Sequence, residues 1–427
     1  MNDYQLTSLV FSALIIILFY AEKLRLKKII TPFTLTAIPF VIIILITNFF
    51  LIDLKFLPVT MRAQYFILGQ LLILWICGYI IASFFKIENI LVSNSYSEVS
   101  HEFKDYSIVL VIISWLTIFV IFRKVLSIFA LHGGPSYFGY GEYEKVMSRG
   151  IVAHVLQVSR VCFLFLLFVY KKSIYKKLIL LSLFGLFLAI SALQIKYHIL
   201  WLILMAFIFY NAENSQKKQI KNLAVASIVL LLVFNLFWVI LTIAWGIFGL
   251  SSEKMWLYIG QQTANYFVSG AILLDKWLNY PNIRPDWILI IVPKNFYNMI
   301  MGNPIRYDFV PLVSIGFKKV AQDVYSNVGT AYGTFYLIGG WSLTIAVTVI
   351  VSILSYIMYF LSYLKNNYFI IFLNLLFLTI GTLMFFGQYF TSLSTYEMPV
   401  ILVAFGGFFK FANFVRNKIS KKRISQV

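Results

Sequence analysis

Long apolar runs separated by short polar segments recur from one end of the chain to the other. Most runs have about 17 to 25 residues, and an α-helix of that length crosses a hydrocarbon layer of roughly 30 Å. Lipid offers no hydrogen-bond partners to an open backbone, so these runs are expected to be helical. The pattern therefore predicts an all-α polytopic integral membrane protein.

The runs predict about eleven crossings, at residues 4–21, 29–51, 65–85, 107–128, 151–170, 178–194, 198–211, 223–248, 329–361, 368–388 and 398–414. The sixth and seventh are short, so they either cross the membrane or form two half-membrane helices that meet around 194–198. The ninth is long enough to tilt steeply or to begin as a surface helix.

One long interruption, residues 249–328, separates the eighth and ninth runs. Its stretch from Trp256 to Trp277 mixes apolar, aromatic and polar residues in the manner of an amphipathic helix at the membrane interface. The chain shows no internal repeat and no duplication of two halves. We therefore predict one transmembrane domain over residues 1–427, with 249–328 as a large extracytoplasmic loop or lid.

The chain carries 35 Lys and Arg against 16 Asp and Glu, a net charge of +19. Cytoplasmic loops of membrane proteins are rich in Lys and Arg, so this charge does not require a nucleic-acid partner. The basic segments 22–28, 171–177, 211–222 and 416–423 fall on one side if the crossings alternate. That side is predicted to be cytoplasmic, with the N-terminus outside and the C-terminus inside. The composition, rich in Ile, Lys, Asn and Phe, is typical of a bacterial source. The outer loops are then 53–64, 131–150, 194–198, 249–328 and 389–397.

Positive charges on the predicted outer side run against this bias and call for another explanation. An ionisable group within a crossing costs several kcal/mol unless it faces a polar cavity or a partner. Arg160 lies about nine residues into the fifth run, and His154 shares nearly the same helical face. Arg160 is either a functional cation or a structural arginine paired with a carboxylate. Lys196 is either a functional cation or an interfacial side chain that extends toward water.

The outer loop 131–150 combines paired glycines, tyrosines and an arginine. Gly133–Gly134 allows backbone amides to approach a ligand or the chain to turn sharply. Tyr137 and Tyr140 offer flat faces and hydroxyls suited to sugar rings, although an aromatic belt at the membrane boundary also contains tyrosines. Arg149 directly precedes a crossing, where a lipid phosphate would lie.

Two arginines of the long loop stand in turn-like sequences: Arg284 between prolines, and Arg306 close to Asp308. Several arginines on one membrane face can hold a diphosphate through bidentate, charge-assisted hydrogen bonds. Solvated loop charges and binding of anionic headgroups are the alternatives. The sequence carries no nucleotide-binding glycine loop, paired-aspartate motif, His-rich cluster or serine elbow, and Cys77 and Cys162 lie in apolar runs. We therefore expect no metal and no cofactor.

The layout resembles the bacterial oligosaccharide repeat-unit polymerases, the Wzy-type O-antigen and capsule polymerases. About eleven crossings with one large outer loop late in the chain cover the whole sequence. Gly133–Gly134 before Arg149 looks like the family's first outer loop, and Lys196 stands in the Arg place of a Gly-Ser-Arg-Ser-like turn. Asn327–Thr330 followed by Gly339–Gly340 is similar to the family's Asn-Val-x-Thr and Asp-Phe-Gly tail, without the Asp.

The resemblance implies a GT-C-like fold and a membrane glycosyltransferase that needs neither nucleotide sugar nor metal. Such an enzyme transfers a growing glycan from undecaprenyl diphosphate to a lipid-linked repeat unit outside the cytoplasmic membrane. Donor and acceptor are then both undecaprenyl-diphosphate-linked oligosaccharides within membrane lipid, and a chain-length regulator is a further partner to consider. The rival functions are a lipid-linked oligosaccharide flippase or other transporter, a membrane acyltransferase, and an O-antigen ligase.

Breaking the bond to the diphosphate places negative charge on the leaving oxygen, which preorganised cations stabilise. The cations expected there are, in order, Arg149, Arg284, Arg306 and Lys196, with Arg160 in the floor of the cavity. The acceptor hydroxyl must lose a proton to a general base. The candidate bases are His132, His154, Glu142, Asp308 and Asp323. The expected substrate contacts are Gly133, Gly134, Tyr137, Tyr140, Tyr266 and Asn327, with Trp256, Tyr258 and Trp277 as further stacking or lipid-interface residues.

Overall fold

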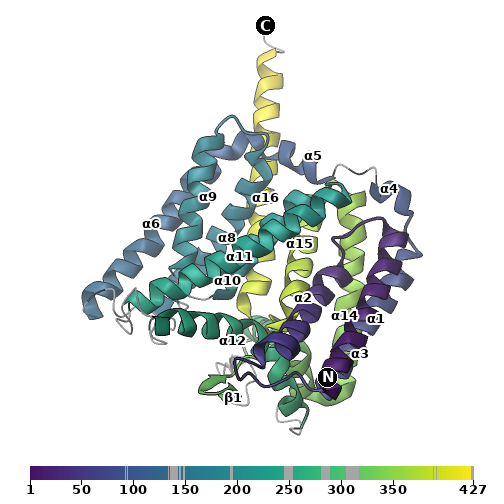
Figure 1. The fold of residues 1–427 in the computed structure, drawn as a ribbon. Helices are drawn as coiled ribbons and strands as arrows, with labels where there is room; N and C mark the ends of the chain where they lie inside the picture. The colour runs from purple at the N-terminus through teal and green to yellow at the C-terminus, as the bar shows by residue number, and fades with distance from the viewer. Residues whose placement is uncertain are drawn as a thin grey trace. The chain divides into compact units, whose positions relative to one another are not determined.

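The computed structural model describes residues 1–91, 93, 95–132, 134, 143, 146–147, 150–192, 196–244, 253–279, 289–303, 317–387, 389–390 and 392–424. Helices dominate this part of the chain (Figure 1). Among the described residues, nine helices are long and apolar enough to cross a membrane. The prediction of an all-α, multi-pass membrane protein is therefore confirmed.

Every predicted crossing contains a helix. They are α1 (Asp3–Leu26), α2 (Pro32–Ile46, continued by the π-helical turn η1, Thr47–Leu51), α3 (Met61–Ala82), α6 (Ser107–His132), α8 (Gly150–Tyr170), α9 (Lys176–Ser191), α10 (Lys196–Asn211), α11 (Gln216–Ala244), α14 (Ala331–Leu364), α15 (Tyr368–Thr382) and α16 (Leu393–Ile424). Helices α9 and α10 have 16 residues each. A helix of that length covers about 24 Å, which is short for a full crossing. Helices α9 and α10 either both cross the membrane or together form a re-entrant pair of half-membrane helices. In both cases the chain returns to the side on which α9 began, so α11 begins on the same side.

The ninth run is broken, which the sequence did not predict. Helix α14 departs from helical geometry at Gly339 and Gly340, and Gly340 adopts a positive φ of 63°. A glycine takes this left-handed conformation at no steric cost. The eight residues before the break are mostly buried, so they pack as a separate short helix rather than lying on the surface.

Shorter elements lie between the crossings: α4 (Ile87–Leu91), α5 (Ser95–Glu102), η2 (Lys104–Tyr106), α12 (Glu253–Leu278), α13 (Ile291–Ile300), η5 (Leu383–Phe385), and the antiparallel strands β1 (Lys318–Ala321) and β2 (Val324–Ser326). Helix α12 confirms the helix expected from Trp256 to Trp277. The hairpin was not predicted, and its turn places Asp323 at a φ of 59°, which Asp tolerates better than most residues.

The described chain divides into two compact units. Unit 1 comprises residues 1–93, 211–361 and 374–393, and unit 2 comprises residues 94–210, 362–373 and 394–427. In unit 1 the hairpin pairs with the loop after η1, since the Leu57 amide donates to the Val320 carbonyl at 2.8 Å. Figure 1 shows the hairpin at the end of this unit where α1 begins.

Contacts within each unit join loops that the alternating topology places on one side. In unit 1, the predicted outer loops 53–64 and 249–328 meet at the hairpin, and the Lys28 ammonium of an inner loop reaches the Ala212 carbonyl of another at 3.3 Å. In unit 2, the Tyr143 hydroxyl of the predicted outer loop 131–150 donates at 2.6 Å to the carbonyl of Ala192, near the outer end of the predicted crossing 178–194. The contacts thus agree with the alternation, and the absolute orientation stays a prediction.

Cysteine labelling tests that orientation. In a chain whose native cysteines are changed to Ala, Gln322→Cys in the exposed hairpin turn should react with an impermeant maleimide in intact cells. Lys217→Cys, exposed at the start of α11, should react only after the membrane is made permeable. The reverse pattern would invert the topology.

The packing of unit 1 requires close approach of α3 and α14 at one glycine. A Cβ added at Gly78 would lie 2.2 Å from the ring of Tyr356, whereas a Cβ at Gly69 of the same helix would meet nothing within 4 Å. We expect Gly78→Ala to destabilise the protein by about 1–3 kcal/mol through overpacking. Gly69→Ala should leave stability unchanged or raise it by up to about 1 kcal/mol. Thermal unfolding in detergent measures both, and equal melting temperatures would contradict this packing.

Candidate functional site

The candidate site of unit 2 begins with a polar line on an otherwise apolar helix. His154, Gln157 and Arg160 follow one another at intervals of three residues on α8, so they lie along one side of the helix. Arg160 comes ten residues after the first residue of α8. That spacing places it about 15 Å along the helix, halfway through a hydrocarbon layer of roughly 30 Å.

The Arg160 side chain is almost completely buried, with 1% of its surface exposed. Its Nη1 donates a hydrogen bond to Oε1 of Gln157 at 3.0 Å and contacts the sulfur of Met398 in α16 at 4.0 Å. The guanidinium carbon lies 5.7 Å from the ring centre of Trp201 in α10. A cation at this depth is costly to hold and marks a functional position by default.

An ion pair between His154 and Glu397 lies between one and two helical turns before Arg160, nearer the start of α8. Nδ1 of His154 and Oε1 of Glu397, in the first turns of α16, are 2.6 Å apart. A carboxylate can only accept, so Nδ1 donates this bond, and in the neutral imidazole Nε2 is then an acceptor. The His154 side chain is 59% exposed and that of Glu397 is 19% exposed.

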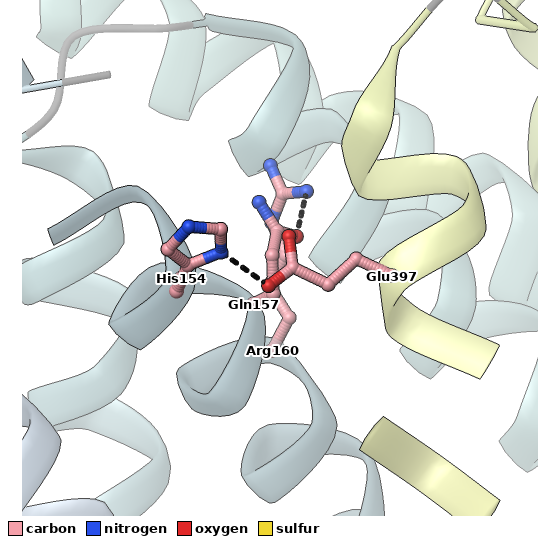
Figure 2. Close-up of polar contacts among 4 residues, drawn as sticks. All are labelled: His154, Gln157, Arg160 and Glu397. Atoms are coloured by element: carbon pink, nitrogen blue, oxygen red, sulfur yellow. Dashed lines mark hydrogen bonds and ion pairs between the residues drawn. The ribbon is translucent and has the colours of Figure 1, made fainter. Parts of the chain in front are cut away.

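Figure 2 shows His154, Gln157, Arg160 and Glu397 grouped between α8 and α16. We call these four residues the α8–α16 polar cluster. It combines an oriented imidazole whose second nitrogen can take a proton, a carboxylate that stabilises the resulting imidazolium, and a buried cation. Chemically, the cluster can deprotonate a hydroxyl beside a bound anion.

Among the residues expected from the sequence, His154 and Arg160 are brought together here. Lys196 is the first residue of α10, five positions before Trp201, and its side chain lies outside the described residues. His132 is the exposed last residue of α6. Gly134, with φ of 110°, donates from its amide to the Phe129 carbonyl, so it forms the sharp turn that was one of the two alternatives.

Other expected contacts belong to unit 1. Tyr266 stacks on Phe386 with ring centres 4.5 Å apart, which is a packing contact within the unit. Trp277 is buried over Gly329, where an added Cβ would lie 2.2 Å from the indole ring. Asn327, after the hairpin, and Asp323, at its turn, are exposed. Eight residues named as expected or candidate site residues in the sequence analysis lie outside the described residues: Arg149, Arg284, Arg306, Asp308, Gly133, Tyr137, Tyr140 and Glu142.

Sequence reasoning missed Glu397 and Gln157. Glu397 ends the predicted outer loop 389–397 and is one of only 16 acidic residues, directly before an apolar run. Its position could have indicated a role, because an acidic residue at the outer end of a helix can pair with a basic residue on the same side of the membrane. Its pairing with His154, 243 residues away, cannot be read from local pattern.

One family model matches this chain, over residues 65–413, and it is described as "Family of unknown function (DUF6337)". The chain belongs to this family. The matched range includes all four residues of the α8–α16 polar cluster and all of α12. No curated protein and no solved structure matches the chain. Membership in DUF6337 does not indicate an activity, because the family is described as one of unknown function.

Proposed function

We propose that this DUF6337 member is a membrane glycosyltransferase with a GT-C-like fold that joins undecaprenyl-diphosphate-linked oligosaccharide repeat units into O-antigen or capsular polysaccharide. The reaction would take place on the extracytoplasmic side of a bacterial cytoplasmic membrane. The observation that carries the proposal is the α8–α16 polar cluster, in which a carboxylate-paired histidine lies two helical turns from a buried arginine. In the predicted topology His154 lies in the outward half of α8 and Arg160 near the middle of the hydrocarbon layer.

The chemistry assigns one task to each group. The acceptor hydroxyl attacks the anomeric carbon of the donor glycan, and its proton passes to Nε2 of His154. The bond between that carbon and the diphosphate oxygen breaks, and its electron pair leaves with undecaprenyl diphosphate. Glu397 holds the ring in the required tautomer and stabilises the imidazolium that forms.

Arg160 would bind the diphosphate and stabilise the charge that grows on it. A guanidinium matches phosphate oxygens through two parallel hydrogen bonds, and it stays charged even where a lysine would give up its proton. Low local dielectric strengthens this interaction relative to water. Arg149 and Lys196, which the predicted topology also places on the outer side of unit 2, would add positive charge to this anion site, and the roles of Arg284 and Arg306 stay predictions from the sequence.

Reconstitution tests the class of activity. Purified protein mixed with lipid-linked repeat units alone should yield a ladder of glycans of increasing length, with no nucleotide sugar or metal added. Movement of the labelled lipid across a vesicle bilayer without elongation would replace the transferase with a flippase. Transfer to a lipid A core acceptor, without a ladder, would replace the polymerase with a ligase.

A further inference from the structure

Unit 1 contains a buried carboxyl that the proposed reaction does not use. Glu22, in the last turns of α1, is 7% exposed. The Tyr356 hydroxyl of α14 donates to its Oε1 at 2.5 Å. Oε2 accepts from the hydroxyl of Thr31 at 2.8 Å and from that of Thr34 at 3.4 Å. Three hydroxyls from two other parts of the unit therefore surround one carboxyl.

This carboxyl has no ion-pair partner within the described part of the chain. Arg25 lines the same small cavity, but its Nη2 donates to Ser83 at 2.8 Å and its guanidinium carbon lies 3.6 Å from the ring centre of Tyr79. Burying a charge that lacks a paired cation is costly. Glu22 is therefore placed to exchange a proton with its surroundings rather than to remain a fixed ion.

A line of buried hydroxyls runs along α14 and ends one residue before Tyr356, whose own hydroxyl donates to Glu22. Thr344, Thr348, Ser352 and Ser355 are all buried and recur at intervals of three or four residues, so they share one face of the helix. The single hydroxyl proton of Thr348 goes either to the backbone carbonyl of Thr344 or to Oε1 of Gln70, and Ser352 donates to the carbonyl of Thr348. Each of these hydroxyl oxygens still has lone pairs that can accept a hydrogen bond.

A small cavity interrupts the close packing beside this line. Its lining includes the hydroxyl-bearing residues Thr36, Tyr332, Thr348, Ser352 and Ser355 together with apolar residues such as Leu74 and Met384. Ser355 directly precedes Tyr356, whose hydroxyl donates to Glu22. Glu22 itself lines a different small cavity, with Arg25 and Tyr79.

At its other end the line reaches the broken part of α14. The Thr344 hydroxyl donates to the carbonyl of Gly340, which lies in the non-helical break. From Thr344 to Tyr356 the helix rises about 18 Å, more than half of a hydrocarbon layer. Interrupted helices in membrane proteins are tolerated where they border a polar cavity, and they recur at ion and substrate sites.

We propose that Glu22 is a proton-binding site of unit 1, served by the hydroxyl line of α14 from the outer half of the membrane. The titratable or charged groups around it are Tyr356 and Tyr359 on α14, Tyr79 on α3, and Arg25 on α1 itself. Segment α2 contributes the hydroxyls of Thr31 and Thr34. Every residue of this site belongs to unit 1, and none belongs to the α8–α16 polar cluster.

Carbodiimide labelling tests the proposal on the purified full-length protein in detergent. Dicyclohexylcarbodiimide adds to a protonated carboxyl in apolar surroundings and rearranges to a stable N-acylurea, which peptide mass spectrometry locates. We expect modification of Glu22 that increases as the pH falls and exceeds that of the more exposed Glu102 by about tenfold. Glu22 left unmodified at neutral and mildly acidic pH, or modified equally at every pH, would overturn the proposal. Protection by Na⁺ but not by K⁺ would also overturn it, in favour of a sodium site.

Infrared difference spectroscopy provides a second readout that needs no reagent to reach the site. Acidifying the wild-type protein should produce a carbonyl band of a protonated carboxyl. Glu22→Gln, whose amide oxygen can accept from Tyr356 or Thr31 while its amide nitrogen donates to the other hydroxyl, should remove that band. Glu102→Gln is the matched control and should leave it in place, and a band unchanged in Glu22→Gln would contradict the assignment.

Discussion

Arg160→Lys lowers the rate of glycan polymerisation by about 100-fold or more if the α8–α16 polar cluster binds the leaving diphosphate. Removing one preorganised donor to a developing oxyanion costs on the order of 100- to 1000-fold in kcat. Lysine keeps a positive charge but loses the planar pair of donors, and at a buried position it can give up its proton. The loss should therefore fall mainly on kcat. Purified variants are compared in the ladder assay at equal protein concentration.

Arg123→Lys is the matched control for this substitution. Arg123 lies in α6, also within unit 2, and its side chain is exposed rather than buried. Exposed substitutions away from a site change little, so its rate should stay within about twofold of wild type. An Arg160→Lys protein that elongates glycans at the wild-type rate would remove Arg160 from the reaction.

His154→Ala should lower the polymerisation rate by about 100- to 10,000-fold, the usual contribution of a general base. Glu397→Gln keeps the shape of the side chain but loses the charge that stabilises the imidazolium, so it should also be strongly impaired. Because the two residues act as one pair, separated by 2.6 Å, the double variant should be little worse than His154→Ala alone. Rates of the four proteins in the ladder assay supply the double-mutant cycle.

Glu102→Gln serves as the control for the acid. Glu102 also forms an ion pair in unit 2, with Lys410 at 3.2 Å, but both side chains are more exposed than that of Glu397. Such pairs contribute roughly 0–1 kcal/mol, so neither activity nor melting temperature should change much. Losses in His154→Ala and Glu397→Gln that simply add would mean that the two residues do not act together.

The helices of this protein could be predicted because a long apolar run in lipid must satisfy its backbone hydrogen bonds internally. The interruptions of these helices were harder to predict. The break at Gly339 and Gly340 depends on buried packing of the eight residues before it, and paired glycines alone do not specify a kink. The hairpin of residues 318–326 is held by bonds to the loop around Leu57, and such nonlocal pairing leaves little trace in the local sequence.

The site was predicted in part for a similar reason. His154 and Arg160 were recognisable because charge inside an apolar run demands an explanation. Glu397 and Gln157 were not, since their importance comes from what they touch. Tyr266 and Trp277, aromatic residues of the loop expected to bind sugar, make packing contacts within unit 1, and their roles as substrate contacts stay predictions. The hydrophobic pattern thus identifies charged residues that are costly to bury in the membrane better than it identifies the residues that pair with them.

The most direct test of the proposed glycan transfer compares the amount of undecaprenyl diphosphate released with the number of glycosidic bonds formed. Each glycosidic bond formed by the proposed reaction releases one undecaprenyl diphosphate, so the released lipid and the new linkages should be equal in number for the wild-type protein. His154→Ala should bind the same lipid-linked repeat unit yet release almost none. Linkages formed without release of the lipid diphosphate, or release unchanged in His154→Ala, would contradict the account.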